Sequence, residues 1–239
     1  MDLNKAAEEI RAAVGAAKGK RILHVTDQHN RLSGFRIAQL LSERLEPDVL
    51  VNTGDISGWG PLVEGVWIRG FCRVRVPTVF APGNHESRDA SGHFQAVGAC
   101  SLDEPSVCEV GGLRFWGYRD PNRSPLLGKP YDLGKCLAAR ERLWPPSVEL
   151  PFIAAVHNRA MVGAMRGVPL VLSGHYHSPR VSRQGPTVSV RAGSTGGGGP
   201  FGGPLELAII DVDGVRHEPL AVWLVSVGEA ATYVKGVAG

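Results

Sequence analysis

The stretch that decides the fold is RILHVTDQH, residues 21–29. It begins as an apolar run of strand length and ends on Asp27 and His29, which carry side chains that can bind metal ions. Four more runs of this kind end on polar motifs: 49–52, 78–81, 152–156 and 170–173. The motifs that follow them are Gly54-Asp55, Gly83-Asn84-His85-Glu86, His157 and Gly174-His175-Tyr176-His177. This order predicts that all five motifs converge on one rim of one sheet.

The motifs supply seven candidate metal ligands: Asp27, His29, Asp55, Asn84, His157, His175 and His177. Any single motif of this length occurs by chance in many proteins, but an ordered set at strand ends is hard to obtain otherwise. Imidazole nitrogens combined with carboxylate and amide oxygens suit Mn, Fe or Zn better than Ca. The sequence therefore predicts a site for two transition-metal ions, divalent or of mixed valence.

A pair of cations about 3.5–4 Å apart can make a hydroxide nucleophile from water and stabilise charge on a phosphoryl group. Asp55 lies at a strand end and follows Gly54, so it is the natural carboxylate to bridge the two ions. Two divalent ions, Asp27, Asp55 and one hydroxide leave a net charge of about +1, which attracts phosphate. The pattern favours metal-dependent hydrolysis of phosphate esters by a bridging hydroxide.

The composition is that of one soluble globular domain, which we expect to span residues 1–239. The chain is 43% hydrophobic and 21% charged, and its formal net charge is +3. The weak positive charge hints at an anionic partner, but there is no basic block, which disfavours nucleic acid. No apolar run approaches the ~20 residues that a transmembrane helix needs.

The cysteine pattern disfavours a structural zinc site and a disulfide framework. The four cysteines stand far apart, without zinc-finger spacing: Cys72, Cys100, Cys108 and Cys136. Buried, reduced thiols are the expected state. Together with an N-terminus that lacks a signal-peptide core, they predict a cytoplasmic location.

Residues 1–18 are predicted to form an amphipathic N-terminal helix. Leu3, Ala7, Ile10 and Val14 recur at helical spacing, with charged residues between them. The apolar face is small and rich in Ala, which favours packing against the same domain. Peripheral contact with a membrane, or docking on a partner, is the alternative.

The remaining pattern is typical of an α/β fold. Helices are predicted at 35–45 and 88–98 between the first strands, followed by a hairpin at 107–118 and a helix at 133–143. The later part is rich in strands, which we place at 187–191, 205–211 and 220–226, with a short helix at 159–166. Two sheets packed together fit this order.

The five motifs, which span residues 27–177, resemble the calcineurin-like metallophosphoesterases, with their pattern D-x-H, G-D, G-N-H-E/D, H and G-H-x-H. The resemblance implies a four-layer αββα sandwich, in which two mixed β-sheets are flanked by helices, and a dinuclear metal centre. By carry-over, one metal is held by Asp27, His29 and His177, the other by Asn84, His157 and His175, and Asp55 bridges them.

The same resemblance makes His85 the general acid that protonates the leaving oxygen. The residues agree, because His85 adjoins Asn84 without being needed for coordination and a histidine can donate a proton near neutral pH. Glu86 is expected either to orient His85 or to form a surface salt bridge.

The motifs narrow the substrate class only in part. Gly54-Asp55 lacks the Asp-Arg-Gly continuation of Ser/Thr protein phosphatases, and the chain is closer to small bacterial phosphodiesterase-like members. Phosphodiesters are the first expectation, with cyclic nucleotides among the candidate substrates. A phosphomonoesterase acting on a small metabolite or nucleotide is the alternative within the enzymes. A non-catalytic metal-binding scaffold for protein interaction is the alternative from another class, although no ligand is missing here.

Several polar residues lie outside this set. His24 is expected to be structural, because strand alternation points it away from the ligands, and His93 and His217 are expected on the surface. The run Gly193 to Gly203 is either a loop over the metals or a plain connector. Three cations could meet a second phosphate or remain solvated: Arg119, Arg123 and Lys129.

Overall fold

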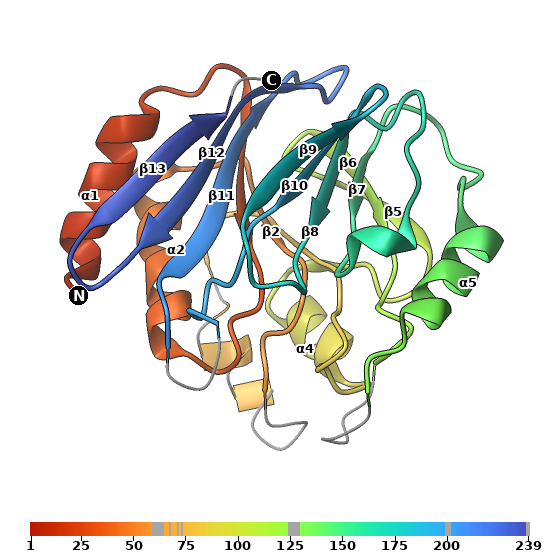
Figure 1. The fold of residues 1–239 in the computed structure, drawn as a ribbon, viewed down its shortest axis with the longest axis horizontal. Coiled ribbons are helices and arrows are strands. Elements are labelled where there is room, and N and C mark those ends of the chain that lie inside the picture. The colour runs from red at the N-terminus through yellow and green to blue at the C-terminus, as the bar shows by residue number, and fades with distance from the viewer. Residues whose placement is uncertain are drawn as a thin grey trace.

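The computed structural model describes residues 1–58, 65–66, 68–70, 72, 74–123, 130–198 and 202–237. Two mixed β-sheets dominate it (Figure 1). The first, in the order β13-β12-β11-β1-β2-β3-β4, consists of β1 (Lys20–Val25), β2 (Val49–Asn52), β3 (Thr78–Phe80), β4 (Cys100–Ser101), β11 (Leu205–Val212), β12 (Pro219–Val227) and β13 (Thr232–Val237). Strands β1 to β4 run parallel, and β11 to β13 extend the sheet in antiparallel pairs.

The second sheet has the order β5-β6-β7-β8-β10-β9. Its strands are β5 (Ser106–Val110), β6 (Leu113–Gly117), β7 (Ile153–Ala155), β8 (Leu170–Ser173), β9 (Arg180–Gln184) and β10 (Thr187–Arg191). The four central strands are parallel, and β5 and β9 pair antiparallel at the edges. The predicted hairpin around Gly111-Gly112 is therefore confirmed as β5–β6.

The sheets pack face to face, and helices cover their outer faces. Alternating side chains such as Ile22 and Phe115 fill the core between the sheets. Leu23, on the other face of β1, packs with α1 (Leu3–Val14) and α2 (Leu32–Leu45) in a second core. On the far side, Phe152 packs with α5 (Leu133–Leu143) and the short helix η1 (Arg159–Met161). The four-layer αββα sandwich is thus confirmed (Figure 1).

The motif-bearing strands belong to both sheets, so the prediction of one rim of one sheet is wrong. Strands β1, β2 and β3 lie in the first sheet, whereas β7 and β8, which precede His157 and Gly174, lie in the second. Sequence order along parallel strands does not reveal which sheet a strand joins. The motifs still converge, because the carboxyl ends of these strands face the same end of the sandwich.

The N-terminal helix packs against its own domain, as predicted, but it ends at Val14. Asp2 caps it by accepting hydrogen bonds from Asn4 N and Lys5 N, and Gly15, at φ 65°, ends it. Ile10 is fully buried against α2 and the first sheet, so the apolar face that a membrane would require is already covered. Within the described residues, no helix has the length and apolar character to cross a membrane.

Sequence patterns missed short or polar elements. Strand β9 consists mainly of exposed polar residues and lies at a sheet edge, where no alternating apolar signal is needed. Strands β4 and β13 were also not predicted, and the helix expected at 159–166 is only the 3₁₀ turn η1. The helix expected at 88–98 is α4 (Ala90–Ala96). The thiols are free as expected, but Cys136 is the one that is fully buried, and the others are half-buried.

Candidate metal centre

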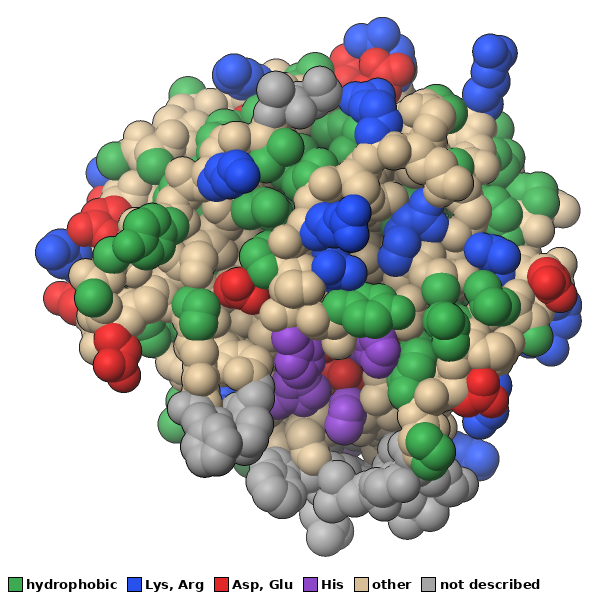
Figure 2. Space-filling view, viewed as in Figure 1, with side chains coloured by type: hydrophobic (Ala, Val, Ile, Leu, Met, Phe, Trp, Pro, Cys, Tyr) green, Lys and Arg blue, Asp and Glu red, His purple; other side chains and the backbone are tan. Residues whose placement is uncertain are grey.

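The seven predicted ligands lie at one end of the sandwich, on loops that follow the motif-bearing strands. Figure 2 shows histidine side chains gathered around a carboxylate on one face of the molecule. Asp27 and His29 follow β1, Asp55 follows β2, and His157 follows β7. His175 and His177 follow β8. Residues separated by up to 150 positions in the sequence, from Asp27 to His177, therefore meet in one place.

The ligand atoms form two clusters. In the first cluster, Asp27, His29 and His177 place one ligand atom each within 4.8 Å of one another, and in the second, Asp55, His157 and His175 do the same. Asp27 Oδ1 lies 3.1 Å from His177 Nε2, and Asp55 Oδ2 lies 3.2 Å from His157 Nε2. Asp55 also groups with His29, so its carboxylate reaches toward both clusters.

The backbone at these ligands is strained. Asp27, His29, Asp55, His175 and His177 have φ values of 51°, 45°, 55°, 71° and 46°. This left-handed region costs non-glycine residues about 1–3 kcal/mol each, and such residues concentrate at functional sites. Sharp left-handed bends directly after the strands turn side chains that would otherwise alternate across a sheet toward one point.

Glycines allow the motif loops to approach one another. A Cβ at Gly54 would lie 2.3 Å from Gly83 N, and a Cβ at Gly83 would lie 2.2 Å from Asp55 Oδ1. A Cβ at Gly174 would lie 2.4 Å from Asp27 Oδ2. A side chain at any of these positions would push two motifs apart, so the glycines position the ligands.

Hydrogen bonds fix the orientation of the ligands. Thr53 O lies 2.7 Å from His157 Nδ1, which makes Nδ1–H the donor and leaves Nε2 free for a metal. Asp27 Oδ2 accepts hydrogen bonds from Thr26 Oγ1 at 2.7 Å and from His175 N at 2.9 Å. Asp55 Oδ1 accepts from His85 N at 3.0 Å. The carboxylate atoms that remain are turned toward the clusters.

Buried polar atoms without a hydrogen-bond partner provide a test of whether a metal fits. Among the described residues, nine buried polar atoms lack such a partner, and three of the nine belong to predicted ligands: Asp27 Oδ1, Asn84 Oδ1 and His157 Nε2. An unpaired buried polar atom costs about 1–3 kcal/mol, and coordination of a cation would remove this cost. All three are metal donors, and the predicted ligand set therefore fits a metal centre.

The ligand histidines differ in their protonation states. Burial, reinforced by the neighbouring His157, lowers the pKa of His175 to about 4, and burial also lowers the pKa of His29. These two rings are neutral near pH 7 and can donate a lone pair. Burial alone would raise the pKa of the Asp55 carboxyl, but the neighbouring His157, His29 and His85 rings together outweigh burial and lower it. The nearby Asp27 carboxylate raises the pKa of His177. Burial alone would lower the pKa of His157, but Asp55 and the other nearby carboxylates raise it well above its usual range, so a metal that binds these two rings would displace a proton.

His85 lies at the mouth of the site and Glu86 beneath it. The Nε2 atom of His85 is 3.9 Å from Asp55 Oδ2, and its side chain remains 39% exposed. Glu86 is completely buried, so the expectation of a surface salt bridge is wrong. Its carboxylate accepts hydrogen bonds from Asp55 N at 3.0 Å, Ile56 N at 2.7 Å and Gly83 N at 2.5 Å. Glu86 therefore joins two motif loops through their backbones.

The remaining histidines differ from one another. His24 is structural, as predicted, because it is fully buried and its Nε2 lies 3.0 Å from Thr53 Oγ1. His93 is half-buried. His217 is buried, so its predicted surface position is wrong, and its Nε2 accepts a hydrogen bond from Arg114 N at 3.3 Å. The turn after β11 folds His217 back onto β6.

The two arginines predicted to meet a second phosphate or remain solvated are engaged in ion pairs elsewhere. Arg119 pairs with Asp103 at 3.1 Å, and Arg123 binds the same carboxylate and the carbonyl oxygens of Glu86 and Ser87. Arg123 is therefore a structural support behind the motif that contains Asn84. Lys129 lies outside the described residues.

The described part of the glycine-rich run supports the first motif. Thr195 N donates to Thr26 O at 2.9 Å, and Gly196 N donates to Asp27 O at 3.1 Å. Ser194 Oγ donates to Asp27 O at 2.8 Å. The segment is thus more than a connector, because it lies beside β1 and reaches the predicted ligand His177: a Cβ at Gly198 would lie 3.2 Å from His177 Nδ1. Residues 199–201 lie outside the described part.

Tyr131 is a neighbour of the site that sequence reasoning missed. Its ring centroid lies 4.0 Å from that of His175, at an interplanar angle of 33°. Its hydroxyl donates to Asp120 Oδ2 at 2.7 Å and accepts from Asn158 Nδ2 at 2.9 Å. Tyr131 belongs to no sequence motif. Its partner Asn158 directly follows His157, and this neighbour was the one sequence feature that could have pointed to it.

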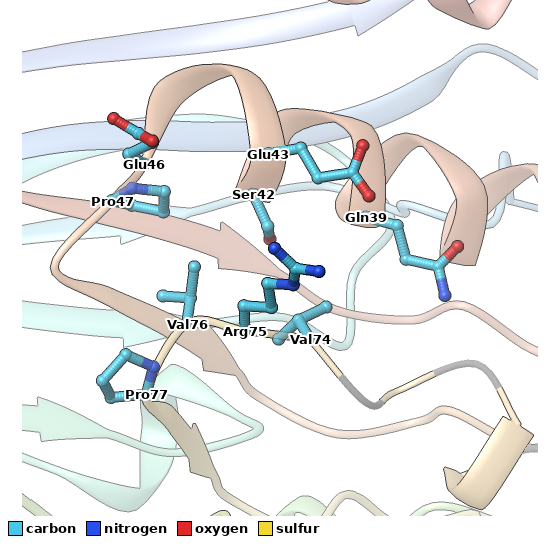
Figure 3. A pocket seen from close by; sticks show the side chains of 9 residues that line it. All are labelled: Gln39, Ser42, Glu43, Glu46, Pro47, Val74, Arg75, Val76 and Pro77. Atoms are coloured by element: carbon cyan, nitrogen blue, oxygen red, sulfur yellow. The ribbon is translucent and has the colours of Figure 1, made fainter.

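A separate cavity of about 610 Å³ lies between the end of α2 and the segment before β3 (Figure 3). Gln39, Ser42, Glu43, Glu46, Pro47, Val74, Arg75, Val76 and Pro77 line it. In Figure 3, Arg75 extends toward α2 near Ser42. None of the seven predicted ligands lines this cavity, so it is a different feature from the metal centre.

Comparisons with known proteins agree with the geometry. The chain is similar to a solved archaeal phosphodiesterase at 13% identity and a TM-score of 0.52, covering 90% of this chain and 99% of that one. It is also similar to Vps29 from Chaetomium thermophilum, at 13% identity and a TM-score of 0.50 over 92% and 97% of the two chains. A double mutant of Vps29 from Entamoeba histolytica is similar at 14% identity and a TM-score of 0.51, covering 91% of this chain and 98% of that one.

These likenesses show a shared fold, and no curated protein matches the sequence. The model of the calcineurin-like phosphoesterases matches residues 20–179, which contain all five motifs. This is more than half of the chain, and it begins at β1 and ends just after His177. The chain therefore belongs to the calcineurin-like phosphoesterase family.

Proposed function

We propose that this protein hydrolyses phosphodiesters at a two-metal centre. The observation that carries the proposal is the convergence of six carboxylate and imidazole ligands into two adjacent clusters. Asn84, whose buried Oδ1 lacks a hydrogen-bond partner, directly precedes His85, which groups with His29 and Asp55. Family membership supports phosphoesterase chemistry in general. Diester specificity is the finer part of the proposal.

The residues divide into two sets of ligands. The first metal would be held by Asp27, His29 and His177, the second by Asn84, His157 and His175, and Asp55 would be shared. When bound, Mn, Fe or Zn ions in this site would lower the pKa of water and stabilise negative charge on phosphoryl oxygens. The strained loops keep the donors in place in advance, which reduces the reorganisation that binding requires.

His85 is the proposed general acid. Its backbone N–H is fixed by Asp55, while its imidazole remains partly exposed beside the clusters, where the leaving group of a substrate could reach it. A histidine in this place can give its proton to a departing alkoxide. A diester hydrolysed to an alcohol requires this proton more than an ester with a stable leaving group does.

The test is turnover of paired aryl phosphates after the metal has been removed and Mn, Zn, Fe or Mg added back. We expect metal-dependent hydrolysis of bis(p-nitrophenyl) phosphate, faster than that of p-nitrophenyl phosphate, and its loss in Asp55→Asn. Faster monoester turnover would indicate a phosphomonoesterase. Tight binding of two ions without turnover would support a metal-binding scaffold.

His85→Ala tests the acid separately. The variant should retain its metal content and lose roughly 100-fold in rate on alkyl diesters, but much less on nitrophenyl esters, whose leaving groups need no proton. Equal losses on both kinds of substrate would remove the acid role from His85.

A further inference from the structure

Two arginines face each other across the last two strands of the second sheet. In the register of β9 and β10, Arg180 lies directly opposite Arg191. Like charges at directly opposed positions destabilise a sheet. Among the described residues, neither arginine has a carboxylate within ion-pair distance. The fold therefore retains a concentration of positive charge that its own stability does not require.

This pair lies beside the metal centre. Arg191 is in register with Ser173, the last residue of β8, which directly precedes Gly174 and the ligands His175 and His177. The Arg191 guanidinium lies 5.0 Å from the ring centroid of Tyr176, the residue between those two ligands. Ser178 fixes the arginine, because its carbonyl oxygen and Oγ accept from Nε at 2.6 Å and from Nη2 at 2.9 Å.

The charge extends beyond the pair. Between Glu149 and Glu206 the sequence contains no Asp or Glu and five arginines: Arg159, Arg166, Arg180, Arg183 and Arg191. Figure 2 shows blue Lys and Arg side chains directly above the purple histidines, on the same face. Burial, followed by the charge of Arg180, lowers the pKa of Arg191, as expected for a cation that lacks an anionic partner.

The neighbouring arginines differ from Arg180 and Arg191 in their hydrogen bonds or in the face of the sheet they occupy. Arg159 uses its N–H groups on Ser189 Oγ at 2.7 Å, on the Val162 carbonyl and on Gln184, so it is a structural residue. Arg183 is exposed on β9, but it faces the opposite side of the strand from Arg180, because it pairs with Val188 of the core between the sheets.

We propose that Arg180, Arg191 and Tyr176 form a subsite for a second anionic group of the substrate, next to the phosphodiester that the metal centre would cleave. The inference rests on the proposed function and names its substrate class: a phosphodiester with a further phosphate, as in a phosphorylated dinucleotide. The guanidinium of Arg191, already held by Ser178, loses little freedom on binding such a group. The half-exposed Tyr176 ring offers a flat surface beside it.

A structural alternative is protection of an edge strand. Strand β9 ends the sheet, and charged residues at an edge prevent pairing with other chains. This role requires charge anywhere on β9 and therefore includes Arg183. Arg191, on the penultimate strand β10, does not serve it. Edge protection therefore involves Arg180 and Arg183, whereas the anionic subsite involves Arg180 and Arg191, so comparing the three arginines distinguishes the two roles.

The experiment compares thymidylyl-thymidine with the same dinucleotide carrying a terminal phosphate. In the metal-loaded wild type, we expect KM for the phosphorylated form to be about tenfold lower, with similar kcat, since a charge-assisted hydrogen bond contributes about this factor. Arg180→Gln and Arg191→Gln should abolish the difference, whereas the matched control Arg183→Gln should keep it. Equal KM values in the wild type, or equal effects of all three variants, would overturn the subsite.

A binding measurement keeps the subsite separate from the proposed function. An NMR titration of the metal-free full chain follows the arginine Nε–H signals while the phosphorylated dinucleotide is added. We expect shifts at Arg180 and Arg191 and about tenfold weaker binding in either variant. If neither dinucleotide is turned over but these shifts occur, diester hydrolysis fails and the subsite stands. Absence of shifts, or aggregation of Arg180→Gln without a change in binding, contradicts the subsite.

Discussion

The two ligand clusters differ in how deeply the fold encloses them. In the second cluster, the side chains of His157 and Asp55 are 0% and 3% exposed, and only His175 is half-buried. In the first, Asp27 is equally buried, but His29 and His177 are 22% and 34% exposed. The second cluster has two buried ligands and one half-buried imidazole, whereas the first has one buried ligand and two half-buried imidazoles. The second cluster should therefore hold its ion more tightly, and the first should exchange its ion more readily.

Removing the support of the second cluster should have the largest effect. Glu86 accepts three backbone hydrogen bonds in the interior, and Glu86→Ala would leave three N–H groups unpaired. We expect a loss of about 4 kcal/mol in the free energy of unfolding, measured by urea denaturation. The half-buried Glu206, which accepts a long 3.4 Å hydrogen bond from Ser194 N, is the matched control, and Glu206→Ala should cost less than about 1 kcal/mol. Similar losses of unfolding free energy in the two variants would show that Glu86 is no more important to stability than Glu206.

Removing one histidine from each cluster should separate the two metal affinities. His157→Ala should weaken the tighter ion by about 100-fold, and His177→Ala should weaken the looser ion by about tenfold, since the latter leaves a more solvated site. Isothermal titration calorimetry with Mn or Zn resolves the two binding steps. The reverse order of effects would show that burial does not set the order of affinity.

His24 links pH to the second cluster, because it contacts Thr53, whose carbonyl holds His157. Burial lowers the pKa of His24 to about 3 in the folded chain. Between this value and the unfolded value of about 6.5, the unfolded state binds the extra proton, so stability is complete above pH 6.5 and falls as the pH decreases.

In the metal-free chain, His24→Gln should reduce the slope of stability against pH by about 1.4 kcal/mol per unit between pH 6 and pH 4. Urea denaturation at several pH values measures this slope. His93→Gln, at a half-buried position away from the site, is the control and should leave it unchanged. An unaltered slope in His24→Gln would contradict a neutral, buried His24.

The smallest effect is expected at the support of the first cluster. Thr26→Val removes the hydroxyl that donates to Asp27 Oδ2, but His175 N continues to hold the same oxygen. We expect about threefold weaker binding of the looser ion and no change in the tighter one, measured by the same calorimetry. A change in the tighter ion instead would show that the clusters are coupled through Asp27.

The sequence predicts which polar residues meet because residues that follow parallel strands lie at the carboxyl end of the sheet, independently of how the other elements are arranged. The αββα sandwich followed from the family resemblance of these motifs. The division of the five strands between two sheets could not be predicted, because it depends on long-range pairing such as β1 with β11. Glu86 was misjudged because its partners are backbone N–H groups of Asp55, Ile56 and Gly83, which no side-chain pattern reveals.

The same limit applies to features that depend on tertiary contacts. Buried His217 and the ring of Tyr131 over His175 occupy positions that only the folded chain defines. The polar strand β9 carries Arg180 without an apolar pattern, so neither the strand nor the charge beside the metal centre could be recognised in advance. Sequence reasoning is strongest for the convergence of polar residues at strand ends and weakest for the residues that support them.

The central claim is a dinuclear centre, and anomalous scattering from crystals grown with Mn tests it most directly. We expect two peaks about 3.5–4 Å apart, one beside Asp27, His29 and His177 and one beside His157 and His175, with Asp55 between them. The peak in the second cluster should persist at lower Mn concentration. A single peak, or none, in crystals that diffract well would contradict the account.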